Sequence, residues 1–273
     1  MGHFQNKTAI VTGGGSGMGR AISEELARQG AIVVIAEINQ ERADQVAHGI
    51  TASGGKAEAV VLDTADAGSV RRVVADAVTR HGRLDFIFNN AGIAIAGDLR
   101  DLSSEQWHRV LDVNLHGVIN GAVAAYGVMA SQGGGHIVNT ASVAGLVPFP
   151  ISVPYAVSKH GVVGLSTSMR LEGEALGVKV SVVCPGGVAT NIWEDTEYVG
   201  AAKDDVMANI PRSMFVSADK AARIILRGVR RNKTYIVFPG HGKLMWWLQR
   251  VWPGLMRVAG RKMVKDFRKA ADA

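Results

Sequence analysis

Cysteine is almost absent from the sequence, and long apolar runs are missing. Its 273 residues include a single cysteine, Cys184. One cysteine excludes an internal disulfide framework and any zinc site built from several cysteines, so we expect a reducing compartment. No uncharged apolar stretch reaches the roughly 18–20 residues that a membrane-spanning helix needs. Residues 1–7 lack the apolar segment of a secretory signal peptide, so we expect a cytoplasmic location.

Acidic residues are outnumbered only at the C-terminal end. The chain carries 30 Lys and Arg against 24 Asp and Glu, a formal net charge of +6. Residues 240–273 hold eight of the basic and two of the acidic residues, so they account for the whole excess. Residues 1–239 are balanced. A nucleic-acid-binding protein needs its positive charge on a recognition element, which the balanced body does not offer. We therefore expect no nucleic-acid partner and no metal site.

The pattern of residues 1–239 predicts an α/β fold. Apolar residues make up 47% of the sequence, enough for a large core. Short apolar or β-branched runs alternate with helical patterns and lie at 8–11, 31–35, 59–62, 84–88, 136–139, 179–183 and 234–238. This alternation predicts a doubly wound, Rossmann-like fold with a mostly parallel seven-stranded sheet and helices on both faces. We expect one dinucleotide-binding and catalytic domain over 1–239, followed by a helical extension over 240–273.

A glycine-rich segment directly follows the first predicted strand. It reads Thr12-Gly13-Gly14-Gly15-Ser16-Gly17-Met18-Gly19-Arg20 and opens a helical pattern. Only glycine lets the backbone turn sharply and approach a pyrophosphate at a helix N-terminus, where negative charge is favoured. The segment predicts a dinucleotide site with contacts from Gly13, Ser16, Gly17, Met18 and Gly19. A glycine-rich turn without a ligand is the alternative.

An acidic residue ends the second predicted strand. Glu37 lies 18 residues beyond Gly19, where a carboxylate can accept hydrogen bonds from both adenosine ribose hydroxyls. It would repel a 2′-phosphate, and neither Ser16 nor Ile38 supplies a compensating cation, so we expect NAD in preference to NADP. A solvated glutamate is the alternative. Asp63, after the third strand, is placed to reach the adenine amino group, although Asp also commonly starts helices.

Two further segments carry groups suited to proton transfer. The fourth predicted strand runs into Asn89-Asn90-Ala91-Gly92, at the sheet edge where open α/β folds bind ligands. A helical pattern places Tyr155 and Lys159 four residues apart and hence on one face. Because a nearby cation favours the phenolate, we expect Lys159 to lower the Tyr155 pKa from its ordinary value near 10 by about 2–3. Tyr155 would then act as a general base near neutral pH.

Together these motifs resemble the short-chain dehydrogenase/reductase family of the classical type. The resemblance covers residues 7–239 and rests also on Asn114, Ser142 and the segment 185–190. It implies that Tyr155 exchanges the proton of the substrate hydroxyl, that Ser142 binds the substrate oxygen, and that Lys159 also holds the nicotinamide ribose. It further implies a water-mediated proton relay at Asn114. From the residues alone, Ser142 also fits a turn or cap serine, and Asn114 a helix kink.

The same resemblance implies the remaining cofactor contacts and the assembly. Besides the glycine-rich segment, Glu37 and Asp63, the expected contacts are Asn90, Ala91, Gly92, Tyr155, Lys159, Pro185, Gly186, Val188 and Thr190. Val188 and Thr190 would bind the nicotinamide carboxamide. The family usually forms homotetramers, so we expect a homotetramer or homodimer through helices near 103–131 and 155–176.

Apolar residues in 146–151 and in the substrate loop after Thr190 predict the kind of substrate. They favour a bulky, apolar secondary alcohol or ketone that is steroid-like, terpenoid or aromatic. The expected lining residues are Val147, Phe149, Ile192, Trp193 and Met207, which an ordinary packing loop would explain equally well. A 3-oxoacyl-thioester reductase, which commonly prefers NADPH, and a non-catalytic nucleotide-binding protein are the alternative functions.

Residues 240–273 show an apolar stripe at helical spacing beside basic residues. The stripe consists of Leu244, Trp247, Leu248, Val251 and Leu255, and after Pro253-Gly254 it continues through Met256, Gly260, Met263 and Phe267. One interpretation is an interfacial segment that makes peripheral contact with an anionic membrane. The other is a helix pair packed on the body, on a neighbouring subunit or over the pocket.

Overall fold

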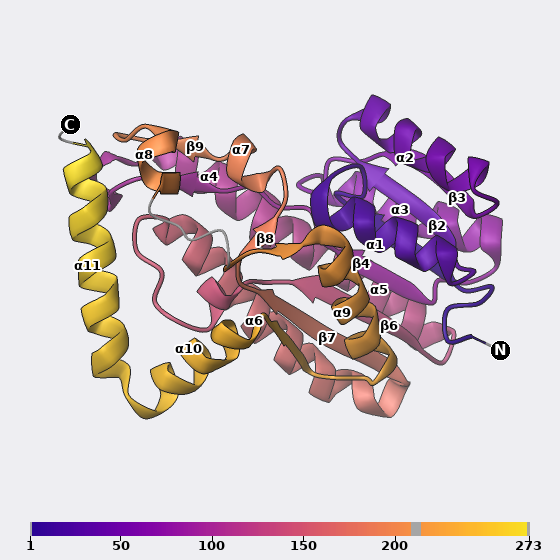
Figure 1. Cartoon of the computed structure of the whole chain (residues 1–273). Helices are drawn as coiled ribbons and strands as arrows, with labels where there is room; N and C mark the ends of the chain where they lie inside the picture. Colours follow the sequence, from indigo (N-terminus) through magenta and orange to yellow (C-terminus); the bar gives the residue numbers. More distant parts are fainter. Residues whose placement is uncertain (1, 209–213, 272–273) are drawn as a thin grey trace.

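Seven parallel strands form the central sheet, in the order β11-β7-β6-β4-β1-β2-β3 (Figure 1). The computed structural model describes residues 2–208 and 214–271. The strands are β1 Thr8–Thr12, β2 Ile32–Glu37, β3 Lys56–Val61, β4 Phe86–Asn89, β6 Gly135–Thr140, β7 Val178–Pro185 and β11 Tyr235–Phe238. Each of them overlaps one of the seven predicted runs. The predicted doubly wound α/β fold is therefore confirmed.

Helices cover both faces of this sheet. The helices of the described chain are α1 Gly17–Arg28, α2 Gln40–Ala52, α3 Ala67–His81, α4 Ser104–Leu111, α5 Gly117–Ser131, α6 Val153–Gly173, α7 Ile192–Asp195, α8 Lys203–Ala208, α9 Ala218–Arg230, α10 Gly240–Val251 and α11 Pro253–Ala271. Those on the two faces include α1, α2 and α9 on one and α3 and α5 on the other. Short 3₁₀ turns occupy Leu99–Asp101, Val143–Gly145 and Glu174–Leu176, and a π-helical turn at Asp112–His116 joins α4 to α5.

Strand residues alternate between two cores because successive side chains point to opposite faces. In β1, Ala9 and Val11 belong to the cluster that packs against α1, α2 and α9. Ile10, between them, belongs to the cluster that packs against α3 and α5. All three side chains are at most 1% exposed. The continuous apolar runs in the sequence thus reflect strands that are buried on both faces.

The strand order reverses between β1 and β4. Because these two strands pair in parallel, their carboxyl ends lie side by side at the reversal point. Asn90, just after β4, donates its backbone N–H to Thr12 Oγ1 at 2.9 Å, and its side chain donates to the Thr12 carbonyl at 3.2 Å. The backbone N–H of Ala91 also donates to Thr12 Oγ1, at 3.1 Å. Ligands in open α/β sheets bind at this reversal point. The glycine-rich turn and the segment 90–92 therefore meet at the expected edge.

Two small parallel pairs lie beyond the sheet. β5 (Ile95–Ala96) pairs with β9 (Glu197–Tyr198), and β8 (Val188–Ala189) pairs with β10 (Val216–Ser217). They tie the segment after β7 to the segments that follow β4 and precede α9. Their backbone pairing holds the predicted substrate loop above the carboxyl edge of the sheet.

The last two helices pack on the body with one face of each. Met245 and Trp246 of α10 and Met256 of α11 pack against the core cluster that contains Cys184. Farther along α11, Phe267 is buried, and Arg268 Nε donates to Asp98 Oδ2 at 2.6 Å. Figure 1 shows α11 along the margin of the molecule farthest from the N-terminus, with its end beside α8.

The predicted apolar stripe of α10 lies on the outer side of the helix. Leu244, Trp247 and Val251 are 55%, 58% and 61% exposed, whereas Met245 and Trp246 face inward. The inner faces of α10 and α11 therefore pack on the body. Among the helices of the described ranges, none has both the length and the hydropathy needed to cross a bilayer.

A neutral histidine is buried inside the sheet. His136 of β6 is 3% exposed, and its Nε2 lies 2.8 Å from Ser181 Oγ. The Ser181 hydroxyl donates to the Lys233 carbonyl at 2.6 Å, so His136 Nε2 must be the donor in the first bond. Burial, reinforced by the charges of Lys179 and Arg170, lowers the pKa of His136 to about 3.

We expect this histidine to make the protein sensitive to acid. The lowered pKa means that the unfolded chain binds a proton below the ordinary value of 6.5, whereas the folded protein stays neutral down to about 3. The stabilisation is complete above that ordinary value and is lost as the pH falls. Between pH 7 and pH 5 it should cost about 2 kcal/mol.

Urea denaturation at these two pH values measures the effect. His136→Gln, which keeps a donor, should lose less stability on acidification than the wild type, whereas His48→Gln on the exposed side of α2 should behave as the wild type. The same pH dependence in all three proteins would contradict the assignment.

Candidate active site

Glycine makes the turn after β1 sterically possible. Gly13 and Gly17 have φ angles of +62° and +50°, in the left-handed region that glycine tolerates best. At Gly19, an added Cβ would lie 2.0 Å from the Gly13 carbonyl oxygen and 2.6 Å from the Asn90 side-chain nitrogen. The turn is therefore so tight that a side chain at position 19 cannot be accommodated.

The N-terminus of α1 has the properties of an anion site. Ser16 occupies the cap position without a side-chain hydrogen bond, and the first turn contains no acidic residue. The first backbone bond of the helix runs from Arg20 N–H to the Ser16 carbonyl at 3.0 Å. The N–H groups of the turn before Arg20 thus precede the helical ladder and carry the positive end of the helix dipole. This arrangement fits the diphosphate of a dinucleotide.

Glu37 lies beside the same turn. Its Oε2 accepts the backbone N–H of Gly15 at 3.2 Å, and its Oε1 accepts that of Ile38 at 3.0 Å. The side chain is 8% exposed. A carboxylate held here is suited to a ribose diol. Asp63 is exposed after β3, and its Oδ1 accepts the Ala65 N–H at 2.9 Å. The cap residue that starts α3 is Asp66, so Asp63 is not the helix-initiating residue of the alternative interpretation.

Arg42 is a cation near the turn that sequence reasoning missed. An added Cβ at Gly15 would lie 2.8 Å from Glu37 Cγ and 3.0 Å from Arg42 Cβ, so the two side chains flank the same glycine. Arg42 is exposed on α2. Positions 16 and 38, next to the turn and to Glu37 in the sequence, carry no positive charge. Helix α2 brings Arg42 back to the turn, and its position three residues after the Asn39 cap was the signal in the sequence.

Asn114 is fully buried in the π-helical turn between α4 and α5. Its amide nitrogen donates to the Ile93 carbonyl at 2.8 Å, and its Oδ1 accepts the Ile93 N–H at 2.8 Å. An added Cβ on Gly92 would lie 3.1 Å from Asn114 Oδ1 and 3.5 Å from Lys159 Nζ. Asn114 thus fixes the segment after β4, and Gly92 lets that segment approach Lys159. Asn114 therefore lies both in an irregular helical turn and beside the candidate site, so its two interpretations are compatible.

Tyr155 and Ser142 meet across the carboxyl edge of the sheet. The Ser142 side chain faces the Tyr155 phenol. Ser142 Oγ donates to the Pro185 carbonyl at 3.3 Å and accepts the Ala144 N–H at 3.1 Å, so it also caps a turn. Burial raises the pKa of the Tyr155 phenol above its ordinary value, while the nearby Ser142 hydroxyl acts in the opposite direction.

This direction differs from the expectation that Lys159 lowers the Tyr155 pKa. Lys159 Nζ lies 5.4 Å from the centre of the Tyr155 ring and donates to the Thr140 carbonyl at 3.0 Å. At that distance the ammonium does not offset the loss of hydration on burial. Burial likewise lowers the pKa of Lys159, which is 3% exposed, to about 8. Both groups are therefore protonated at neutral pH.

The segment after β7 closes the other side of the glycine-rich turn. An added Cβ at Gly17 would lie 3.0 Å from Thr190 Cβ. Val188 is buried in β8, and its carbonyl accepts the Trp193 indole N–H at 2.9 Å. Pro185 and Gly186 lead from the end of β7, beside Ser142, into this segment. Sequence-distant residues expected to contact one cofactor are thus brought together.

The predicted substrate-lining residues do not share one environment. Val147 is 1% exposed and packs inside the core cluster with Val143 and Val162. Phe149, Ile192 and Trp193 are partly exposed. Trp193 packs edge-on against Phe215, with ring centres 5.3 Å apart. The side chain of Met207 in α8 lies outside the described residues.

Ile151 is a second position that the sequence did not reveal. Its φ of +68° is unusual for a β-branched residue, and its carbonyl accepts the Gly97 N–H at 2.7 Å. The next residue, Ser152, donates its hydroxyl to the Ile95 carbonyl at 2.6 Å. These bonds clamp the chain against β5 immediately before α6, whose first turn carries Tyr155. These hydrogen bonds hold the strained backbone of Ile151 directly before the helical turn that orients the Tyr155 phenol.

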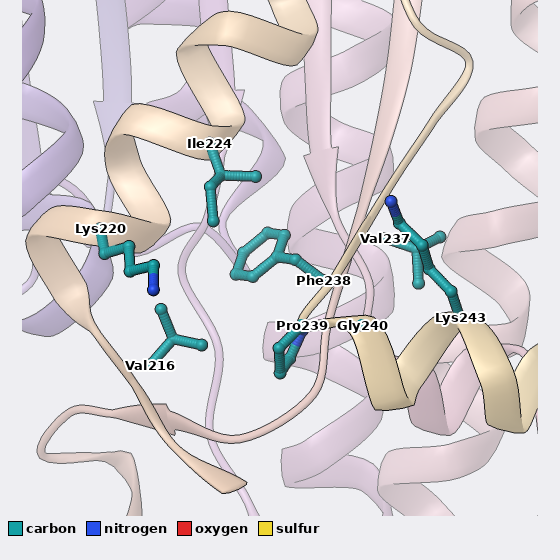
Figure 2. A pocket seen from close by; sticks show the side chains of 8 residues that line it. All are labelled: Val216, Lys220, Ile224, Val237, Phe238, Pro239, Gly240 and Lys243. Atoms are coloured by element: carbon teal, nitrogen blue, oxygen red, sulfur yellow. The ribbon is translucent and has the colours of Figure 1, made fainter. Parts of the chain in front are cut away.

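A pocket of about 340 Å³ lies away from this cluster, between α9, β11 and α10 (Figure 2). Ile224 and Phe238 form part of its apolar wall, and Lys220 and Lys243 lie at its sides. None of the predicted site residues lines it. The chemistry of the carboxyl edge, with its buried amine and partly buried phenol, identifies the candidate active site better than the size of this pocket. Within the described ranges, no group of three or more His, Cys, Asp or Glu side chains is arranged to hold a metal.

A family model described as short chain dehydrogenase matches residues 7–198. The chain belongs to the short-chain dehydrogenase/reductase family. It is 40% identical over 200 residues to a cyclohexanol dehydrogenase of Acinetobacter sp. (strain SE19), covering 72% of this chain and 80% of the relative. It is also 35% identical over 272 residues to a probable oxidoreductase, EphD, of Mycobacterium tuberculosis. That match covers 96% of this chain but 46% of EphD, so the chain spans less than half of that relative.

A solved structure of this short-chain dehydrogenase/reductase family has the same fold. It is a protein from Burkholderia phymatum in complex with NAD, with a TM-score of 0.82 and 26% identity. The match covers 93% of this chain and 96% of that one. Other relatives are named 3beta-hydroxysteroid dehydrogenase, from Mediterraneibacter gnavus, and 3-oxoacyl-[acyl-carrier-protein] reductase, from Thermotoga maritima.

We expect Gly19→Ala to weaken dinucleotide binding by this family member about tenfold or more, because the added methyl group collides with the Gly13 carbonyl. The matched control is Gly127→Ala in α5, where an added Cβ meets nothing within 4 Å. NADH fluorescence titration measures the affinity, and thermal unfolding shows that both variants fold. Unchanged binding by folded Gly19→Ala would contradict the role given to the turn.

Proposed function

We propose that the protein is an NAD-dependent oxidoreductase that transfers a hydride between NAD(H) and a bulky, apolar secondary alcohol or ketone. The placement of the Ser142 side chain beside the Tyr155 phenol, with buried Lys159 near its ring, carries this proposal. A phenol, a hydroxyl and an ammonium at the carboxyl edge of the sheet are suited to holding a substrate oxygen and moving its proton. A purely nucleotide-binding protein needs none of the three.

The residues around the turn fit a nicotinamide dinucleotide. The N-terminus of α1 would hold the diphosphate, Glu37 the adenosine ribose and Asp63 the adenine amino group. Gly13, Asn90, Ala91 and Gly92 form the floor between them. Pro185, Gly186, Val188 and Thr190 would hold the nicotinamide end, with Lys159 at its ribose. When bound, the nicotinamide supplies or accepts the hydride.

Tyr155 would move the proton. Its raised pKa keeps the phenol protonated at neutral pH, which suits donation to a ketone oxygen in the reductive direction. In the oxidative direction Tyr155 must first lose its proton, and the positive charge of an oxidised nicotinamide would favour that loss. Ser142 would donate a hydrogen bond to the same oxygen and keep it in line with the phenol.

Lys159 would position groups and supply charge. Its pKa of about 8 leaves the ammonium mostly charged at neutral pH. The charge lies within 3.5 Å of where a Cβ of Gly92 would be, so a ribose near Gly92 is within its reach. Asn114, clamped to Ile93, keeps this approach open and would carry a water-mediated relay toward Lys159.

The expected lining residues and the relatives support the substrate class. Phe149, Ile192 and Trp193 present partly exposed apolar surface. Relatives named for cyclohexanol and for a 3β-hydroxysteroid support a cyclic secondary alcohol. An NADH fluorescence screen across secondary alcohols of graded size and polarity tests the class. Preference for short, charged alcohols would overturn it.

A 3-oxoacyl-thioester reductase is the second candidate. The relative from Thermotoga maritima carries that name and is 31% identical over 233 residues. Glu37 opposes it, because that reaction commonly uses NADPH. Turnover of an acetoacetyl thioester with NADPH, faster than that of any ketone with NADH, would decide for this candidate.

We also propose a homotetramer or homodimer. The long helices α5 and α6 carry exposed apolar residues, among them Val123 at 61% and Leu171 at 72%. A second copy covering these helices would remove such side chains from water. Light scattering in solution gives the assembly directly.

The cofactor preference should depend on Glu37. We expect Glu37→Gln to raise kcat/KM with NADP(H) relative to NAD(H) about tenfold or more, because it removes a buried negative charge beside the ribose. Glu41→Gln on exposed α2 makes the same charge change and should leave the ratio unchanged. Glu37→Gln/Arg42→Gln should lose the gain, since Arg42 is then the cation that meets the 2′-phosphate. A wild-type preference for NADP(H) would refute the assignment.

Tyr155→Phe should abolish turnover but keep the cofactor site. Removing only the phenolic oxygen should lower kcat by about 10²–10⁴-fold, the usual contribution of a general acid or base. NADH affinity should stay largely intact. Tyr126→Phe in α5, at a partly buried packing position, is the control and should retain activity. Retained turnover in Tyr155→Phe, or lost NADH binding with normal folding, would contradict the role.

A further inference from the structure

Helices α10 and α11 leave large apolar side chains exposed that nothing in the described structure covers. Seven of them are between 39% and 67% exposed: Leu244, Trp247, Val251, Trp252, Leu255, Val258 and Met263. We name these residues the outer tail face. Two exposed tryptophans on one helix pair are costly to leave in water, because each ring presents a large apolar area. A gathering of this kind marks an interaction site.

The charges around the outer tail face have one sign. Lys243, Arg250, Arg257, Arg261, Lys262, Lys265 and Lys269 are all exposed, and the acidic residue in the described part of the tail, Asp266, is only partly so. The body, residues 1–239, has no net charge. The positive field is therefore local to these two helices.

The shape of this region also restricts its partner. α10 and α11 meet at a corner around Trp252 that projects from the rest of the molecule (Figure 1). Val251, Trp252 and Leu255 lie at this corner and are about half to two-thirds exposed. A projecting corner with apolar side chains at its tip is suited to entering a deformable layer. A two-fold contact with another copy would bring the basic residues of both tails together.

We propose that the outer tail face docks the protein on an anionic lipid bilayer. Its apolar residues would enter the boundary between headgroups and acyl chains, and the surrounding Lys and Arg would pair with lipid phosphates. Tryptophan suits this boundary because its ring is apolar and its indole N–H is polar. The proposal goes beyond the oxidoreductase activity and does not depend on the substrate.

Docking would set the orientation of the candidate active site. The inner side of α11 faces the loop before α6, with Gly260 next to Pro150, and Arg268 is paired with Asp98 near β5. α11 also contacts α8 of the substrate loop. A membrane on the outer tail face would therefore lie on the outer side of α11, whose inner side borders the substrate loop. An apolar substrate dissolved in the bilayer would be released close to that side.

Co-sedimentation of the full chain with vesicles tests the proposal. Vesicles of phosphatidylcholine with phosphatidylglycerol should carry the protein down, and vesicles of phosphatidylcholine alone should do so at least about tenfold less. Raising the salt from about 0.05 M to about 0.5 M should weaken binding, because exposed charges are screened. Tryptophan fluorescence should shift to the blue on binding.

Surface variants with matched controls identify the contact. Trp247→Ser/Trp252→Ser and, separately, Arg257→Gln/Lys262→Gln should each weaken vesicle binding about tenfold or more. The controls make apolar-to-serine and charge-removing changes at exposed positions elsewhere: Val61→Ser/Leu99→Ser for the apolar pair and Lys56→Gln/Arg71→Gln for the charged pair. The control proteins should bind as the wild type, and thermal unfolding establishes that all variants are folded.

Three results would overturn the proposal. The first is no sedimentation of the wild type with either kind of vesicle. The second is equal binding by the tail variants and their controls. The third is a change of oligomeric state in the tail variants, seen by light scattering, without vesicle binding by the wild type, which would assign the surface to a second copy of the chain.

Discussion

The buried ammonium of Lys159 is the constraint on which the candidate site depends. A charged amine loses most of its hydration at 3% exposure, and the Thr140 carbonyl is its hydrogen-bond partner in the fold. Its neighbours must therefore leave room for further oxygen ligands. Gly92 has no side chain to fill that room, and the Asn114 amide holds the Gly92 segment in place by two bonds to Ile93. The burial of Lys159, the close approach of the Gly92 backbone and the turn held by Asn114 thus all shape the surroundings of the Lys159 ammonium.

The sequence predicts the architecture well because its signals are local. Every strand of the sheet overlaps a short apolar or β-branched run, and the glycine-rich turn is recognisable because only glycine meets its steric requirement. Tyr155 and Lys159 are four residues apart on one helix, so their common face follows from helix geometry. The order of the motifs along the chain then identifies the family, which residues 7–198 confirm.

What the sequence does not predict depends on contacts between distant segments. Val147 is apolar in either environment, and only the packing of α10 and α6 around it shows that it is core. The pKa of Tyr155 is set by a balance between lost hydration and a distance to Lys159 that spacing alone does not give. Ile151 adopts a left-handed backbone because two hydrogen bonds to the β5 region impose it. The outward direction of the apolar stripe on α10 likewise cannot be predicted without knowing the body, against which Met245 and Trp246 pack.

The ion pair between Arg268 and Asp98 joins the final turns of the chain to a segment 170 residues away. Asp98 follows β5, which pairs with β9 at the start of the substrate loop. Cleavage of the chain before Arg268 would thus release the link between α11 and the region where β5 pairs with the substrate loop, while the central sheet would stay intact.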